Sequence, residues 1–151
     1  MVTTVNRPVS VNLSLRASTA DELMTENPIS IRHGAGVREA IALMTDRGFT
    51  VAPVIDASGQ PVGVVSLTDI LIHNREYSRC LKAGVEDSDL ADRTTVKDIM
   101  TPAIIVVGPD TTAAEVVRSP LKYRVHHLFV ADDQGTLIGV ISMGDILRNL
   151  A

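Results

Sequence analysis

The stretch GVVSLTDIL occupies residues 63–71, and a nearly identical stretch, GVISMGDIL, occupies residues 139–147. Six of the nine positions are the same, and the glycine, the serine and the aspartate keep their spacing. We call the separation in sequence between Gly63 and Gly139 the repeat offset. A duplication of this kind indicates an internal repeat, which has to be recognised before any fold is assigned.

The repeat offset also aligns the sequence upstream of this stretch without gaps. It places Met24-Thr25 on Met100-Thr101, Ile29 on Ile105, Glu39 on Glu115, Val54 on Val130 and Gly59 on Gly135. We therefore divide the chain into an N-terminal segment (1–20), a first repeat (21–84), a linker (85–95) and a second repeat (96–151). Because domains as small as one repeat are marginally stable, the two repeats are expected to pack on each other as one globule.

Each repeat has the same order of local patterns. A short extended stretch comes first, at residues 28–32 and 103–107. A helical pattern follows, with Val37, Ala40, Ile41 and Met44 at the i, i+3, i+4, i+7 spacing. Two apolar runs separated by a turn with Gly and Asp then predict a β-hairpin. A last helix opens at LTDIL or MGDIL, so the sequence predicts a mixed α+β fold of two β-α-β-β-α units.

The N-terminal segment carries a pattern of its own. Residues 9–15 read VSVNLSL, and this strict alternation is typical of a strand that is half buried. We expect one further strand here, whose apolar side chains cover the module or a second subunit. By contrast, residues 85–95 read VEDSDLADRTT, which is typical of a solvated linker.

The composition limits the functions that the chain can have. The 151 residues include 45% apolar and 21% charged residues, with a net charge of −4 and no tryptophan. A chain without a basic stripe or aromatic platforms is a poor binder of nucleic acid. Cys80 is the single cysteine, which suits a reducing compartment. No apolar run approaches a membrane span, so we expect a cytoplasmic protein without a membrane anchor.

The repeated stretch has a purely structural interpretation. Ser66 with Asp69, and Ser142 with Asp145, fit the S-x-x-D form of a capping box. In such a box the serine and the acid satisfy free N–H groups where a helix begins. On this interpretation the motif only starts two helices.

The same geometry also suits a ligand. Free N–H groups and the positive end of the helix dipole favour an anion at a helix N-terminus. A serine hydroxyl supplies one more donor, and an aspartate one turn later can accept both hydroxyls of a ribose. A glycine before the paired aliphatic residues allows a close approach to the strand. The pattern therefore predicts a site for a ribose phosphate.

The chain resembles a tandem pair of cystathionine-β-synthase (CBS) domains over about residues 21–150. The resemblance rests on DELMT (21–25), KDIMT (97–101), VAPVID (51–56) and the G-h-h-S-x-x-D motif of both repeats, where h is apolar. It implies two β-α-β-β-α units that pack through their sheets about a pseudo-two-fold axis. It also implies two clefts that bind an adenine nucleotide (AMP, ADP or ATP) or S-adenosylmethionine.

The resemblance assigns roles to residues of both repeats. Asp69 and Asp145 would hold ribose, while Ser66 and Ser142 would contact phosphate. The adenine would be bordered by four residues: Ile29, Ile105, Pro53 and Phe129. The Thr101-Pro102 stretch matches the family best and favours Asp145 as the stronger ligand residue.

The sequence departs from the family pattern at several positions. Phe129 replaces the usual proline of its strand and is expected to narrow the base pocket of the second repeat. Pro120 falls at the position of Met44, inside an expected helix, where it should end or kink the helix. The arginine that often precedes the family aspartate is missing from both motifs.

We found no sequence support for catalysis or for a metal site. The chain has no nucleophile elbow, P-loop or Rossmann glycine run. His126 and His127 are adjacent on an expected strand and point to opposite faces, so they do not share one ion. The leading hypothesis is a non-catalytic, homodimeric sensor of adenosyl ligands that signals to a separate partner protein. The alternative is a structural dimerisation or adaptor module that binds no ligand.

Overall fold

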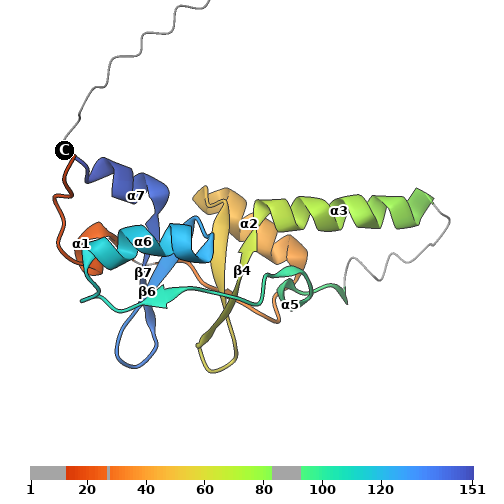
Figure 1. Cartoon of the computed structure of the whole chain (residues 1–151). Coiled ribbons are helices and arrows are strands. Elements are labelled where there is room, and N and C mark those ends of the chain that lie inside the picture. The colour runs from red at the N-terminus through yellow and green to blue at the C-terminus, as the bar shows by residue number, and fades with distance from the viewer. Residues whose placement is uncertain (1–12, 27, 83–92) are drawn as a thin grey trace, which may run out of the picture.

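The computed structural model describes residues 13–26, 28–82 and 93–151. Each repeat contains the predicted strand, helix, strand, strand and helix in that order, and short elements that were not predicted precede both units (Figure 1). In the first half they are α1 (Ala20–Leu23), β1 (Thr25–Glu26), β2 (Ile31–Arg32), α2 (Val37–Arg47), β3 (Val51–Ile55), β4 (Pro61–Ser66) and α3 (Leu67–Lys82). In the second half they are α5 (Val96–Ile99), β5 (Val106–Val107), α6 (Ala113–Tyr123), β6 (His127–Ala131), β7 (Leu137–Ser142) and α7 (Met143–Arg148). None of the described helices is long and apolar enough to cross a membrane.

The strands form two mixed sheets, which confirms the predicted α+β fold of two β-α-β-β-α units. One sheet has the order β2-β3-β4, and the other has the order β1-β7-β6-β5. In each repeat the first strand runs parallel to the second, which pairs antiparallel with the third. The two hairpins lie side by side in Figure 1, with helices at the same end of both. The strands predicted at 28–32 and 103–107 are shorter than expected, two residues each.

The helices after β2 and β5 each have one end that is capped by a residue typical of that position. Helix α2 buries Val37, Ala40 and Met44, as the apolar spacing predicts, and ends at Gly48 with φ 70°. Helix α6 begins at Thr112, whose side chain accepts a hydrogen bond from Glu115 N. Pro120 does not end this helix, which continues to Tyr123, and that part of the prediction was wrong. Pro120 is buried on the inner face of the helix, where packing offsets the lost backbone hydrogen bond.

The predicted hairpins are closed by matching turns. Asp56 Oδ1 accepts hydrogen bonds from Ser58 N (2.9 Å) and Gln60 N (3.0 Å). Asp132 Oδ1 accepts from Gln134 N and Thr136 N, both at 3.0 Å. The hydrogen bond from the Ser58 hydroxyl, followed by that from Gln60 N, lowers the pKa of Asp56 below its ordinary value. The two repeats therefore keep the same turn chemistry.

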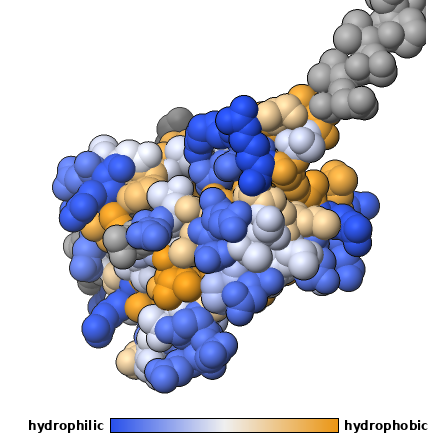
Figure 2. All heavy atoms as spheres, turned by 90° about the vertical axis from the view of Figure 1, so that its left-hand side faces the viewer, coloured by the Kyte–Doolittle hydropathy of each residue, from blue (hydrophilic) through white to orange (hydrophobic). Residues whose placement is uncertain are grey.

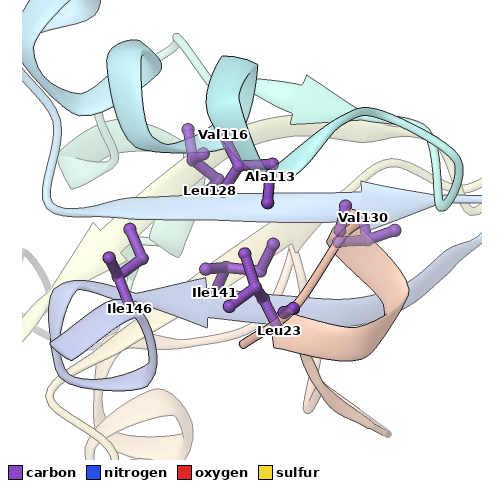
Figure 3. Packing of buried hydrophobic residues seen from close by; sticks show 9 residues of the cluster. Leu23, Ala113, Val116, Leu128, Val130, Ile141 and Ile146 are labelled. Carbon is purple, nitrogen blue, oxygen red and sulfur yellow. The ribbon is translucent and has the colours of Figure 1, made fainter. Parts of the chain in front are cut away.

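The hydrophobic core consists of two clusters that do not follow the sequence repeats. Ala20 and Leu23 of α1 belong to the cluster built around β6, β7 and α6 of the second repeat. Figure 3 shows Leu23 beside Ile141 in that cluster. Val96 of α5 belongs instead to the cluster built around β3, β4 and α2 of the first repeat. The helix that leads into the first repeat, α1, therefore completes the core of the second repeat, and α5 completes the core of the first.

The strands show the same exchange. We call residues 20–26 and 96–101, which lead into the two repeats, the leading segments, and each of them pairs with the sheet of the other repeat. Thr25 pairs with Val140 on β7, and Thr101 pairs with Val64 on β4. The second pairing uses two hydrogen bonds, Val64 N to Thr101 O at 3.0 Å and Thr101 N to Val64 O at 2.8 Å. The repeat offset relates Thr25 to Thr101 and Val64 to Val140. The exchange is therefore reciprocal, and the leading segments tie the two repeats together.

The N-terminal segment meets the C-terminus in the part that the structure describes. Leu15 forms a bridge with Leu150, and Ser14 exchanges two backbone hydrogen bonds of 3.0 Å with Ala151. Leu15 packs against the cluster built around β6, β7 and α6. Leu13 is 57% exposed, so it does not cover the module itself, and the cover of a second subunit stays a prediction. Figure 2 views this end of the molecule, where apolar residues gather beside the grey segment. Residues 9–12 of the expected strand lie outside the described residues.

Candidate functional site

The first copy of the repeated motif forms a reciprocal capping pair where β4 passes into α3. Ser66 N donates to Asp69 Oδ2 at 2.9 Å, and Asp69 N donates to Ser66 Oγ at 3.1 Å. Both side chains are half-buried. Ser66 and Asp69 therefore cap the start of α3 as a capping box would.

The second copy forms a capping box at the start of α7 with additional partners. Ser142 N donates to Asp145 Oδ2 at 2.8 Å, and Asp145 N donates to Ser142 Oγ at 3.2 Å. Arg148 Nη2 forms an ion pair with Asp145 Oδ1, and Thr25 Oγ1 lies 3.4 Å from the same oxygen. Asp145 is only 7% exposed, and these contacts give each of its two oxygens a partner.

Two cavities adjoin these helix starts, and they differ in size. The first cavity has a volume of about 410 Å³. It lies between β4 of the first repeat and two stretches of the second repeat, within residues 101–105 and 125–129. Its lining includes Ser66, Thr101, Ile105, His127 and Phe129. The second cavity has a volume of about 220 Å³ and is lined by Thr25, Thr50, Val51, His127, Val140, Ser142, Asp145 and Arg148, among others. Each cavity thus takes side chains from both repeats.

The predicted site residues are distributed unevenly over these cavities. Ser66 meets Ile105 and Phe129 in the first cavity, and Ser142 meets Asp145 in the second. Asp69 lines a third cavity of about 510 Å³ between α3 and α5, together with His73 and Asp98. Ile29 is half-buried and Pro53 is buried, but neither lines any of these three cavities. Only part of the predicted set is therefore brought together.

Phe129 and Thr101 occupy positions that the sequence alone did not predict. Phe129 is 1% exposed and lines the first cavity, which is the larger of the two, and the narrowing of the base pocket by its ring stays a prediction. Thr101 lies across from Val64 on β4 and lines the same cavity as Ser66. The Thr101-Pro102 stretch therefore belongs beside the motif of the first repeat, and its use as support for Asp145 was wrong.

The glycines of the motif allow a close approach, but by the protein itself. A Cβ atom built on Gly139 would lie 2.9 Å from Met24 Cβ. A Cβ atom on Gly63 would lie 2.5 Å from Thr101 O and 2.9 Å from Met100 Sδ. Both neighbours belong to the exchanged leading segments. The glycine is thus required for the pairing of β4 and β7 with these segments.

His127 lies at the junction of the first two cavities. Together with Thr50 and Val51 it lines both of them. Burial lowers the pKa of His127 below its ordinary value, and the neighbouring His126 lowers it further, while Asp145 acts in the opposite direction. The neutral imidazole is therefore favoured, and it offers one donor and one acceptor to the cavities. Among the described residues, no group of three or more His, Cys, Asp or Glu could hold a metal ion.

Two contributors to the site escaped the sequence analysis. Arg148 reaches Asp145 because it lies three residues later on the same helix, a spacing that brings side chains together. Thr25 reaches the same carboxylate from the other repeat, through the pairing of β1 with β7. The helical spacing could have revealed the first contact, whereas the second required the strand pairing.

Comparisons with known proteins agree with this architecture. The family model for the CBS domain matches residues 20–75 and 96–151. Chloroplastic CBSX2 of Arabidopsis thaliana is 30% identical over 162 aligned positions, which cover 95% of this chain and 68% of that protein. The uncharacterized protein MJ1426 of Methanocaldococcus jannaschii is 28% identical over 146 residues, which cover 83% of this chain and 87% of the relative.

Solved structures give the same assignment. The crystal structure of CBSX2 in complex with AMP has a TM-score of 0.69 and 29% identity, and covers 87% of this chain and 95% of that one. The cytosolic domain of the Mg²⁺ channel MgtE in complex with ATP has a TM-score of 0.68 and 27% identity. That match covers 89% of this chain and 49% of the MgtE chain. Both neighbours hold an adenine nucleotide.

Proposed function

The chain belongs to the CBS domain family, and from that premise we propose that it is a non-catalytic regulatory module that binds an adenine nucleotide between its two repeats. The observation that carries the proposal is the first cavity. Its volume of about 410 Å³ falls within the range of small-molecule sites, about 300–1,000 Å³. It combines an apolar wall with hydroxyl groups of Ser66, Thr68 and Thr101.

The lining of the first cavity suits a nucleotide in two parts. Ile105 and Phe129 offer an aliphatic and an aromatic surface to a base, as in mostly apolar ligand pockets. Ser66 lies at the start of the 16-residue helix α3, where the helix dipole favours a phosphate. The complexes of CBSX2 with AMP and of MgtE with ATP support this class of ligand. ADP and S-adenosylmethionine remain within the same proposal.

In the remaining roles we keep the assignment by resemblance. Asp69 and Asp145 hold ribose, and Ser142 contacts phosphate in the second cavity. Ile29 and Pro53 keep their assignment to the adenine, although neither lines one of the three cavities described above. The ligand changes how the module contacts a separate partner protein in the cytoplasm. The support for the two aspartates is their position beside the capping serines, one helical turn inside α3 and α7.

We further propose that the protein is a homodimer. Leu71 on α3 and Leu147 on α7 occupy equivalent positions of the two repeats and are 67% and 63% exposed. Paired exposed leucines on the last helix of each repeat suit a self-complementary interface, which a two-fold dimer requires. The same surface supports the alternative function, a structural dimerisation module whose S-x-x-D motifs only cap helices. Light scattering gives the mass, and a monomeric mass would contradict both.

Ligand binding separates the two functions. At about 100 times its Kd, an adenine nucleotide should add ~2.7 kcal/mol of stability. For a chain of this size the melting midpoint should then rise by roughly 5–10 °C. AMP, ADP, ATP and S-adenosylmethionine are compared with GMP in a thermal unfolding assay. A flat response to all adenosyl compounds would favour the structural module.

The aspartates distinguish a cap from a ribose site. Asp69→Ala or Asp145→Ala should lose charge-assisted hydrogen bonds of ~1.5–3 kcal/mol, which corresponds to a ~10- to 150-fold weaker Kd at the affected site. Thr112→Ala serves as the matched control, because Thr112 caps α6 and lines neither the first nor the second cavity. It should cost about 0.5–2 kcal/mol of stability and leave the Kd unchanged. Wild-type affinity in the double aspartate variant would sink the ribose assignment.

A further inference from the structure

We propose that Arg148 closes the second cavity in the ligand-free protein, so that an adenine nucleotide fills the first cavity before the second. The proposal rests on the proposed function and deepens it, because it assigns an order to the two sites. The cause of this order is Arg148, which has no equivalent arginine in the first repeat.

The carboxylate of Asp145 has no oxygen left for a ribose. Oδ2 accepts from Ser142 N at 2.8 Å and from Ser142 Oγ at 3.0 Å. Oδ1 is paired with Arg148 Nη2 and lies 3.4 Å from Thr25 Oγ1. A ribose hydroxyl needs an acceptor oxygen with a free lone pair. The guanidinium of Arg148 already uses Asp145 Oδ1 as its acceptor. Arg148 therefore stands where a sugar would bind.

The volume of the second cavity agrees with a closed site. Small-molecule sites measure about 300–1,000 Å³, and the second cavity holds only about 220 Å³. Arg148 is one of its lining residues, so withdrawal of the guanidinium enlarges the space directly. The first cavity, at about 410 Å³, needs no such rearrangement.

The first repeat lacks the equivalent ion pair because its sequence differs at one position. The repeat offset places Arg148 on Ile72, which is 52% exposed on α3. An isoleucine cannot pair with Asp69, although the capping pair of Asp69 and Ser66 is the same. The two motifs thus share the capping pair, and they differ in the residue three positions after the aspartate, which is Ile72 in the first repeat and Arg148 in the second.

The ion pair between Arg148 and Asp145 is weak enough for a ligand to break it. The Arg148 side chain is 72% exposed, and an ion pair with so exposed a partner shifts an equilibrium by no more than about fivefold. Once released, the guanidinium lies beside the cavity and presents a planar set of donors that match a phosphate. A phosphorylated nucleoside can therefore open the site, with the phosphate replacing Asp145 as the partner of Arg148.

The test follows one methyl-bearing residue in each cavity. Ile105 lines the first cavity but not the second, and Val140 lines the second but not the first. In a titration of the methyl-labelled full chain with AMP and then ATP, the Ile105 signal should move first and the Val140 signal at a concentration up to about fivefold higher. In Arg148→Ile, which copies the first repeat, the midpoint for Val140 should fall by up to about fivefold.

A charge control and the opposite outcomes complete the test. Arg118→Ala removes the same charge from α6, away from both cavities, and should leave both midpoints unchanged. Coincident midpoints in the wild type, or an unchanged Val140 midpoint in Arg148→Ile, would overturn the closure while nucleotide binding stands. If neither residue responds in any variant, the proposed function fails, and the order of filling fails with it.

Discussion

At the scale of single residues, identical side chains have different surroundings in the two repeats. Asp69 and Asp145 both accept from the backbone of a preceding serine, which holds each carboxylate at a helix start. Of the two, Asp145 is the one that is buried and paired with an arginine. The motif therefore fixes where the carboxylate lies, and the neighbours decide what it can still bind.

His127 makes the stability of the protein depend on pH. Burial, followed by the charge of His126, lowers its pKa in the folded state, so the unfolded chain binds the proton more readily. This contribution to stability is fully present above the unfolded pKa of about 6.5 and is lost as the pH falls below it. The free energy of unfolding, measured by denaturant titration from about pH 7.5 to 5, should therefore decrease less in His127→Gln than in the wild type.

The control for this pH effect is His73→Gln, since His73 lies on α3 and lines neither of the first two cavities. A wild-type slope in His127→Gln would show that the imidazole contributes nothing to it.

At the scale of elements, the glycines of β4 and β7 explain why the motif begins with glycine in both repeats. The strand face at Gly63 is covered by Met100 and Thr101, and the face at Gly139 is covered by Met24. The sequence indicated a close approach and assigned it to a ligand. The structure assigns it to the leading segment of the other repeat, which leaves no room for a side chain.

Gly139→Ala should therefore destabilise the protein by roughly 1–3 kcal/mol, the usual cost of overpacking. The new methyl group would meet Met24, whose Cβ lies 2.9 Å from the built position. Chemical denaturation measures the change. Gly34→Ala is the matched control, because nothing lies within 4 Å of a Cβ atom there.

A double-mutant cycle with Met24→Ala tests the cause of this destabilisation. If the clash with Met24 is responsible, the penalty of Gly139→Ala should shrink in the Met24→Ala background, because the two residues share one contact. An equal penalty in both backgrounds would place the strain elsewhere on β7.

At the scale of the whole molecule, the order of the chain and the order of the cores differ. Helix α1 packs with α6 and β7, while α5 packs with α3. Figure 1 shows this exchange, with α1 at the end of the molecule that holds the C-terminal strands. A change at Leu23 should therefore act on a sheet that lies far away in sequence, in the second repeat.

Leu23→Ala tests this long-range packing. Leu23 is 3% exposed in the second-repeat cluster, and truncation of a buried leucine costs about 2–5 kcal/mol. Hydrogen exchange should accelerate more in β6 and β7 than in β3 and β4, which are nearer in sequence. Val96→Ala should give the reverse pattern, because Val96 packs in the other cluster. Acceleration confined to the repeat that carries the substitution would contradict the exchange.

The sequence predicted the features that local patterns determine. The hairpins, the helix of Val37, Ala40 and Met44, and both capping pairs depend on residues close together in the chain. The exchange was not predictable in this way, because nearly identical leading segments give no indication of which sheet each one covers. Pro120 does not end α6 for a related reason, since its burial outweighs the local helix-breaking preference of proline. The closure by Arg148 also required the three-dimensional cavity.

The reciprocal exchange has a consequence for how such a molecule could arise. With this packing, a polypeptide that carries one repeat alone has its leading helix on a neighbour's sheet, so two copies form a domain-swapped pair. Joining the copies in one gene makes that encounter intramolecular, so folding no longer depends on two chains meeting in solution. Each half of a fused gene is then free to differ from the other, and Ile72 and Arg148 are such a difference at equivalent positions.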